Sequence, residues 1–433
     1  MCKRDGNATV LLLACMATTP AWGGGSDASQ QASAAYSPAW PSDIWSQPGL
    51  LDGPASPMEG LRNAGVDLKA FLTQTYMGLP AGSAAHEWQY GGKMTLNATF
   101  DGAKFGLWPG FSVNVIQEWE YGNDINAVGS GAVLPINGVM AFPRLGGSDA
   151  DTAINVTQKF GDAFSLSLGK FALLDMVAKT PLVGGGGYET FMNAAIAGPI
   201  TGVMPPYIFG GIATLKTEPA IFTAMVYDPR NAQDWDVISQ PFSQGTTGAL
   251  TVTFPNRIAD LPGYYVLRGV GSTKEGLNLA QIPDLVALPP ASVDELKKKG
   301  YWYVAGSFQQ YLHEDSERPG NGWGVFGYLS LADGNPNPIN WSGFVGLGGN
   351  SPLAGRELDK WGVAYFYYGI SPDLINGLSS LGIERRNEQG AEAFYNVAVT
   401  PWLQITADLQ WIAPFDATKE NIVAAGIRTQ IRF

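Results

Sequence analysis

The sequence predicts an all-β fold: a transmembrane antiparallel β-barrel of about sixteen strands, with short periplasmic turns and long external loops. Charged residues make up only 15% of the 433 residues, whereas an ordinary soluble domain has about 25%. From about Gly65 onward, units of roughly ten residues alternate apolar and polar side chains and end in turns rich in Gly, Pro, Asn or Asp. After the leader, no apolar run approaches the length of a spanning helix, so a membrane-spanning chain must form a closed sheet.

The first 24 residues have the order of a secretory signal peptide. Lys3 and Arg4 provide the basic segment, and Ala8 to Ala17 provide the short apolar core. A lipoprotein leader is an alternative, because Leu12 to Cys15 resembles a lipoprotein processing box. Both alternatives predict an exported protein. The predicted organisation is a signal peptide (1–24), a loose periplasmic segment rich in Ser, Ala, Gln and Pro (25–60) and the barrel (61–433).

Few residues have the chemistry of a catalytic or metal site. Both cysteines, Cys2 and Cys15, lie in the predicted leader, which argues against a disulfide, Cys-ligated zinc or thiol catalysis. His86 and His313 are far apart, and no metal-ligand or triad spacing is visible. The formal net charge of −12 argues against nucleic-acid binding and favours cations or neutral solutes in a pore. We therefore predict neither enzymatic activity nor a cofactor.

The clearest alternation runs from Trp402 to Ile412. One face carries apolar residues and the other polar residues, namely Leu403, Ile405, Ala407, Leu409 and Trp411 against Gln404, Thr406, Asp408 and Gln410. Charged and amide groups recur on the second face of other strands, which suits a wet lumen better than a dry sandwich core. The predicted strands are 65–78, 89–100, 110–121, 151–161, 163–172, 207–217, 219–229, 246–254, 263–270, 301–312, 322–331, 340–348, 361–369, 391–399, 402–412 and 421–433.

The connections alternate in length, as they do in bacterial barrels. The long outer ones are predicted near 122–150, 173–206, 230–245, 271–300 and 370–390. Several inner ones are tight, whereas gaps near 101–109, 255–262, 313–321 and 349–360 are longer than ideal. The strands 246–254 and 263–270 have the weakest pattern. A soluble β-sandwich, for example a secreted lectin, is the alternative all-β fold.

The last strand has the most specific local pattern. Its apolar residues alternate with polar ones, namely Val423, Ala425, Ile427, Ile431 and Phe433 with Arg428, Gln430 and Arg432, and the chain ends on Phe433. A final amphipathic strand that ends in an aromatic residue resembles the signal that the outer-membrane assembly machinery recognises. We expect this strand to direct barrel assembly.

Short motifs occur in order through the C-terminal part of the chain. They are Gly322–Asn335 (GWGVFGYLSLADGN), Val345–Gly349, Gly355–Arg356, Asp359, Trp361–Ala364, Glu392–Tyr395, Thr400–Leu403, Asp408–Gln410 and Ile427–Phe433. From Tyr301 to Phe433 the chain thus resembles the carbohydrate-selective porin family of bacterial outer membranes. Upstream, Gly60–Arg62, Gly65–Val66 and Trp108–Gly110 fit less closely.

The resemblance implies a sixteen-stranded outer-membrane barrel, often trimeric, through which monosaccharides and similar small hydrophilic solutes diffuse inward. It implies no catalysis and no energy coupling. The partners expected from it are such solutes, outer-membrane lipid and lipopolysaccharide, the barrel-assembly machinery, and two further copies in a homotrimer. The alternative is a general porin, or one selective for ions or organic acids, with the same barrel.

Selective sugar passage needs a constriction lined by hydrogen-bonding groups and aromatic or guanidinium planes. The loop 173–206 has the position at which a general porin folds its third loop into the pore, although a flexible surface loop is equally compatible with its glycines. Its candidate residues are Asp175, Lys179, Tyr188 and Glu189. On the walls, the candidates with inward parity are Lys93, Asn97, Asn114, Glu118, Glu120, Asp408, Gln410 and Arg428.

Two other features have simpler interpretations. Tyr365 to Tyr368 and Tyr301 to Tyr303 are expected in interfacial aromatic girdles, with a sugar-contacting lumen position as the alternative. The charged run Asp294 to Gly300 is expected to be a short solvated helix or loop.

Overall fold

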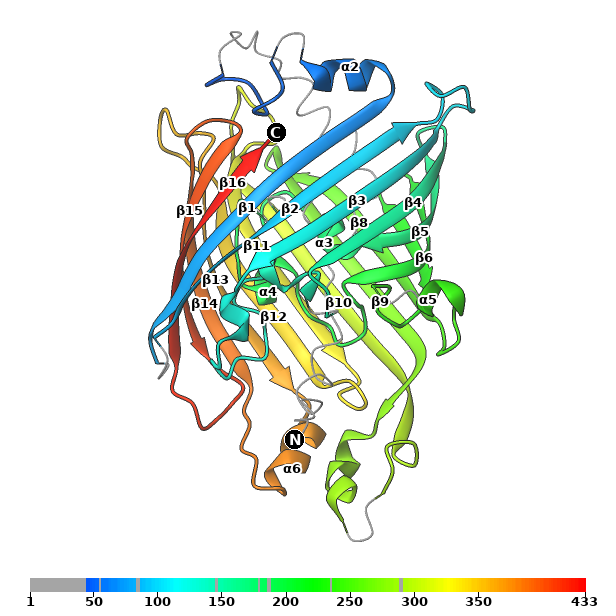
Figure 1. Cartoon of the computed structure of the whole chain (residues 1–433), viewed down its shortest axis with the longest axis vertical. Coiled ribbons are helices and arrows are strands. Elements are labelled where there is room, and N and C mark those ends of the chain that lie inside the picture. The colour runs from blue at the N-terminus through cyan, green and yellow to red at the C-terminus, as the bar shows by residue number, and fades with distance from the viewer. Residues whose placement is uncertain are drawn as a thin grey trace.

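The computed structural model describes residues 44–53, 56–82, 86–144, 147–177, 180–184, 188–233, 236–287 and 291–433. They form a closed barrel in which each strand pairs antiparallel with the next and β1 pairs with β16 (Figure 1). The predicted sixteen-stranded fold is confirmed. The strands are β1 (Val66–Ala81), β2 (Trp88–Asp101), β3 (Phe111–Gly122), β4 (Ala150–Phe160), β5 (Phe164–Ala172), β6 (Tyr207–Lys216), β7 (Ile221–Tyr227), β8 (Thr247–Ile258), β9 (Leu261–Leu277), β10 (Lys297–Glu314), β11 (Gly322–Ala332), β12 (Ile339–Asn350), β13 (Lys360–Ile370), β14 (Glu388–Ala398), β15 (Leu403–Ala413) and β16 (Ile422–Arg432).

Every predicted strand overlaps an observed one, and the main differences concern β8, β9 and β10. The gap predicted at 255–262 closes to a two-residue turn, Ala259 and Asp260, both with positive φ, which suits a tight hairpin. The expectation of a helix or loop at Asp294–Gly300 is wrong from Lys297 onward, because Lys297 pairs with Leu277 in the β9–β10 ladder. Where a hairpin extends beyond the bilayer, both of its faces meet water. Its residues then need not alternate between apolar and polar, so a prediction based on this alternation does not detect the strand.

The alternation of the sequence becomes an inside and an outside face. On β15, Leu409 is 54% exposed on the outer surface, whereas its neighbours Asp408 and Gln410 point inward and are buried. On β16, Arg428 points inward and is 0% exposed. The outward-pointing side chains of a barrel strand must be apolar because they contact the bilayer.

The end of the barrel that carries the chain's C-terminus also holds the described N-terminal residues. The helix α2 (Pro57–Asn63) begins with Ser56, whose Oγ accepts a hydrogen bond from the backbone N–H of Glu59 (3.2 Å). The N–H of Leu50 donates to the carbonyl of Arg432 (2.8 Å). Figure 1 shows this segment outside the wall, above β1. The predicted signal peptide lies outside the described residues.

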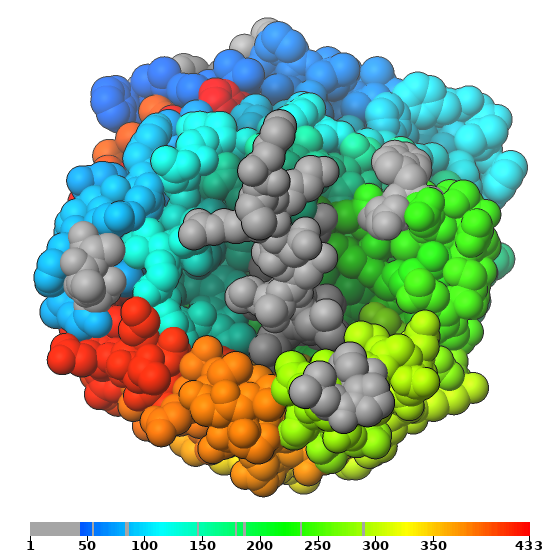
Figure 2. Space-filling view, turned by 60° about the horizontal axis from the view of Figure 1, so that its bottom comes forward, coloured from blue at the N-terminus to red at the C-terminus, as the bar shows by residue number. Residues whose placement is uncertain are grey.

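The opposite end carries the longer connections, as expected for the external side. Its helices include η6 (Leu279–Val286) and α6 (Pro372–Ser379), which pack together below the barrel in Figure 1. Figure 2 shows this end, where segments coloured from blue to red are arranged in a ring. Other short helices in the described residues are η2 (Ile125–Ala127), η3 (Val139–Ala141), α3 (Leu173–Val177), α4 (Ala194–Ala197) and α5 (Asp236–Ser239). Within the described ranges, no helix is both long and apolar enough to cross a membrane.

Candidate functional site

Two external loops fold back into the barrel. One joins β3 to β4 (123–149) and the other joins β5 to β6 (173–206). Their apolar side chains pack against the inner face of the wall in one cluster, for example Phe142 of the first loop and Phe191 of the second with Phe326 of the wall. The loops therefore fill part of the lumen and narrow it.

The inward position of 173–206 is one of the two alternatives that the sequence left open. The inward position of 123–149 was not predicted, although a signal was present. Val133 to Ile136 and Val139 to Phe142 are largely apolar, which is unusual for a connection that stands in water. In the structure most of these residues are buried.

A pocket remains between the wall of β1 to β3 and the two loops. Lys93 and Asn97 reach it from β2, Glu118 from β3, and Asp175 and Tyr188 from the second loop. The pocket thus brings together five residues predicted from the sequence, three from strand parity and two from the position of the loop. Among the lining residues that the sequence did not predict, Phe71 and Thr95 both have inward parity in the β1–β2 ladder.

The centre of this pocket combines an ion pair with an aromatic ring. Lys93 Nζ lies 2.8 Å from Glu118 Oε1 and 5.4 Å from the centroid of the Tyr188 ring, which is cation–π geometry. Tyr188 also stacks with Phe71, with ring centroids 6.5 Å apart. Partial burial raises the pKa of Tyr188, so its hydroxyl stays protonated at neutral pH. The result is an aromatic surface beside fixed charges.

Residues on the inner face of the wall stabilise the Lys93–Glu118 ion pair. The Tyr207 hydroxyl on β6 donates a hydrogen bond to Glu118 Oε2. Lys170 Nζ lies 5.2 Å from the centroid of the Tyr207 ring and forms an ion pair with Asp151. Glu118 therefore has a fixed position, and it fixes Lys93 in turn.

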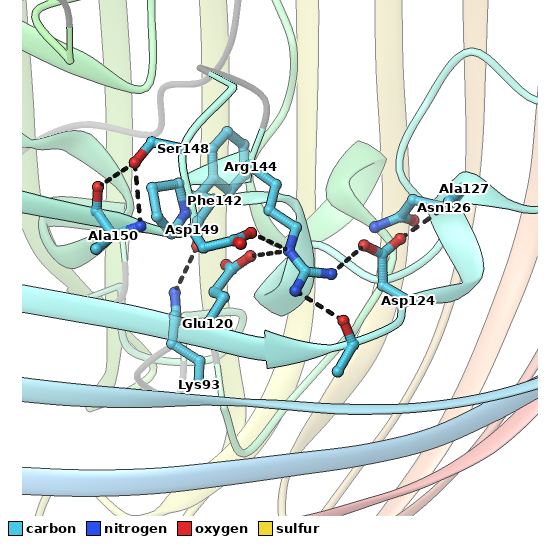
Figure 3. A network of polar contacts seen from close by, with 12 residues as sticks. Lys93, Glu120, Asp124, Asn126, Ala127, Phe142, Arg144, Ser148, Asp149 and Ala150 are labelled. Carbon is cyan, nitrogen blue, oxygen red and sulfur yellow. Dashed lines mark hydrogen bonds and ion pairs between the residues drawn. The ribbon is translucent and has the colours of Figure 1, made fainter.

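Arg144 fastens the first loop at both of its ends (Figure 3). Its guanidinium lies 3.0 Å from Asp124 Oδ2, where the loop begins, and 3.1 Å from Asp149 Oδ1, where it ends. It also lies 3.2 Å from Glu120 Oε2 on β3. Nearby, Lys93 donates to the carbonyl of Phe142 (3.2 Å), as Figure 3 shows. The predicted candidate Glu120 thus serves the loop and does not line the pocket.

The opposite wall, formed by β14 to β16, fastens the second loop. Glu392 accepts hydrogen bonds from the backbone N–H groups of Met192 and Asn193, the latter at 3.0 Å. Gln410 Oε1 accepts from Asn193 Nδ2 (2.9 Å), and Arg428 donates to the carbonyl of Thr190 (2.6 Å). The candidates Asp408, Gln410 and Arg428 point inward as expected, but the loop covers them.

A second carboxylate on β14 fastens the first loop. Glu388, four residues before Glu392 and on the same inner face, accepts from the N–H groups of Val133 (2.7 Å) and Leu134 (3.0 Å). It also accepts from Phe415 N–H (2.9 Å) in the β15–β16 connection. One strand therefore anchors both inward loops through buried carboxylates, which sequence reasoning did not identify.

The remaining candidates lie elsewhere. Asn114 accepts a hydrogen bond from Thr99 on the inner wall (3.0 Å). Glu189 is buried and pairs with Lys360 and Arg432. Lys179 lies outside the described residues.

The aromatic run on β13 divides between both faces of the wall. Tyr365 and Tyr367 face outward, as a girdle requires, whereas Phe366 and Tyr368 point inward and are buried under the second loop. The Tyr368 hydroxyl accepts from Ile200 N–H (2.8 Å). The girdle expectation is therefore wrong for every second residue.

Residues 85–433 match the family model of the carbohydrate-selective porins, OprB family. The chain belongs to the carbohydrate-selective porin family. The high-pH structure of OprB from Pseudomonas putida superposes on this porin with a TM-score of 0.76 at 17% identity, covering 90% of this chain and 100% of that one.

A structure of OmpF from Salmonella typhi with daunomycin superposes on the porin with a TM-score of 0.52 at 9% identity, covering 86% of this chain and 99% of that one. At these identities, both structures support the barrel fold. No curated protein sequence matches significantly. Family membership assigns the porin to the bacterial outer membrane and to passive carbohydrate passage.

Proposed function

We propose that small carbohydrates diffuse passively through this barrel into the periplasm and that the pocket around Tyr188 selects them. The observation that carries the proposal is the combination of the Phe71–Tyr188 rings with the Lys93–Glu118 pair. A pyranose has one face of C–H groups, which suits an aromatic ring, and a rim of hydroxyls that need donors and acceptors. Contacts of this kind replace hydration weakly enough for the solute to leave again.

The charges of the pocket favour neutral solutes over organic acids. Lys93 contributes one positive charge, whereas Glu118 and Asp175 contribute two negative ones, so the formal sum is 1 − 2 = −1. An anion in this narrow space meets a net repulsion. This argues against the organic-acid alternative, which has the same barrel.

The test is the current through single channels in a planar bilayer, with and without glucose. We expect stepwise openings that glucose partly blocks, and a block that Tyr188→Ala abolishes. Tyr365→Ala, which removes an outward tyrosine, is the matched control and should keep the block. Equal passage of glucose and of carboxylates of the same size, with no effect of Tyr188→Ala, would contradict the proposal.

We further propose that residues 1–24 direct export and that the assembly machinery recognises the strand that ends at Phe433. The exposed apolar rows of the wall support contact with lipid and, in the outer leaflet, lipopolysaccharide. Removal of Phe433 should leave exported but unassembled chains, seen as loss of the heat-modifiable band on gels.

We also propose a homotrimer joined through β1 to β4. The outer face there carries amides at positions that are apolar on most other strands: Gln74 donates to the hydroxyls of Tyr90 (2.8 Å) and Tyr121 (3.1 Å), and Gln117 bonds Thr152. Polar groups are costly in hydrocarbon, so a protein partner at this face is favourable. Cross-linking through cysteines at Gln74 should give trimers, whereas cysteines at Leu250 on β8 should not.

A further inference from the structure

An apolar groove and a polar pocket meet on the outer surface, at the periplasmic end of β11 to β15. The groove has a volume of about 580 Å³, and outward-pointing residues of the wall line it, among them Val363, Ala393, Ala407 and Leu409. These residues are neighbours across the ladders, because Ala393 pairs with Val363 on one side and with Leu409 on the other. Their small alanine side chains leave a hollow between larger ones.

The groove is closed towards the periplasm by the β12–β13 turn, which contributes Ser351, Pro352 and Leu353. Buried Asp359 holds this turn. It accepts from Arg356 (2.7 Å), from the Tyr395 hydroxyl (2.9 Å) and from the backbone N–H of Ala398 (2.9 Å). The groove is thus preformed, which lowers the cost of filling it.

The polar pocket lies beside this turn and shares Ser351 and Pro352 with the groove. It has a volume of about 230 Å³, and its ionisable lining is Asp315, Glu317, Glu357, Arg318 and His313. With His313 neutral, the formal charge of the lining is 1 − 3 = −2. The backbone N–H of Gly355 bonds Glu357 and lowers the pKa of that carboxyl, so it is ionised at neutral pH.

Two tryptophans lie between the two hollows. Trp361 lines the groove and Trp323 lines the polar pocket, with ring centroids 6.2 Å apart. Tryptophan and tyrosine are enriched at the headgroup level of a membrane. The order along the barrel axis is therefore hydrocarbon depth, interface and aqueous rim, at the end that also carries the C-terminus.

We propose that this composite surface binds one phospholipid of the periplasmic leaflet whose headgroup carries a primary ammonium. One acyl chain fills the groove, because inside a bilayer acyl chains are the apolar molecules that reach it. The phosphate lies at the level of the tryptophans near Arg318, which is 3.6 Å from both Asp315 Oδ2 and Glu357 Oε2. The ammonium donates to the three carboxylates, which repel an anionic headgroup.

The test is native mass spectrometry of the full-length barrel, with phosphatidylethanolamine, phosphatidylcholine and phosphatidylglycerol of identical acyl chains. We expect one tightly held phosphatidylethanolamine, retained at least tenfold more than the other two. The double variant Ala393→Leu, Ala407→Leu fills the groove and should lose it. Ala391→Leu, on the same strand and face but outside the groove, should keep it.

A second variant tests the headgroup without touching the wall. Glu357→Gln lies in the turn, and it should reduce the preference for phosphatidylethanolamine over phosphatidylcholine while the barrel stays heat-modifiable. Equal retention of the three lipids, stronger retention of phosphatidylglycerol, or unchanged binding by the groove-filling variant would each overturn the proposal. Sugar passage is measured separately and does not depend on this site.

Discussion

The inner walls on the two sides of the lumen carry similar charged residues but use them differently. On β2 and β3, Lys93 and Glu118 pair with each other and face the pocket. On β14 and β16, Glu392 and Arg428 bond the backbone of the second loop and lie beneath it. The difference teaches that an inward charge in this barrel is either a contact for solute or an anchor for a loop, and that alternation alone does not distinguish the two.

The largest expected effect comes from removing an anchor. Glu392→Ala leaves the N–H groups of Met192 and Asn193 without their acceptor. Leaving two buried N–H donors unpaired costs on the order of 3 kcal/mol, which is about a hundredfold in the equilibrium between the fastened and the released loop. We expect higher and noisier single-channel conductance from a barrel that stays heat-modifiable. Gln389→Ala, on the outer face of the same strand, should leave conductance unchanged. A quiet wild-type conductance from Glu392→Ala would show that the loop does not depend on β14.

The next effect comes from breaking the solute-facing pair. Lys93→Met leaves Glu118 buried without its cation, which costs about 3 kcal/mol or more. The pore also loses a positive charge, so we expect its preference for K⁺ over Cl⁻ to rise by about a factor of ten, measured as a reversal potential. Lys104→Met in the exposed β2–β3 turn is the control. The double variant Lys93→Met, Glu118→Gln should bring both stability and ion selectivity back towards the wild-type values. If it does not, the two residues do not act as a pair.

A smaller effect tests the support behind the pair. Tyr207→Phe removes the hydroxyl that donates to Glu118, worth about 1.5 kcal/mol, and we expect a roughly tenfold weaker glucose block with unchanged conductance. Tyr227→Phe, which alters a buried tyrosine at the end of β7, should not weaken it. A lower conductance in Tyr207→Phe would instead indicate that the wall itself has moved.

The smallest effect concerns the Tyr188 hydroxyl. Tyr188→Phe keeps the ring and its cation contact, so we expect only about 1 kcal/mol of lost sugar interaction. Because burial raises the pKa of Tyr188 above its ordinary value of about 10, the phenol does not ionise below about pH 9. We therefore expect the glucose block, measured as a function of pH below about 9, to show no titration step in the wild type that is absent from Tyr188→Phe. Such a step would contradict the structure of the pocket.

The fold was largely predictable because strand periodicity is local. Leu409 and Asp408 occupy opposite faces because successive residues of any strand do, and a bilayer requires one face to be apolar. The fold prediction failed where that requirement stops, as at Lys297 in the protruding hairpin.

The candidate site was predictable only in part. Parity predicted that Lys93 and Glu118 face inward, and the position of the 173–206 loop in the strand order suggested Tyr188. These three residues meet in one pocket only because of the path of the loop. The pattern of neighbouring residues in the sequence does not predict that path. Glu388 shows the limit clearly, because its partners Val133 and Leu134 lie about 255 positions away in sequence.

The sequence by itself determined that this chain is a barrel, which residues face inward and, through family motifs, which class of solute it carries. These properties follow from periodicity, composition and short motifs, and each is readable within a few strands. Only the tertiary structure decided which inward charges meet solute and which fasten a loop. That choice depends on contacts between distant segments, since a carboxylate such as Glu392 becomes an anchor only when backbone N–H groups from elsewhere in the chain reach it.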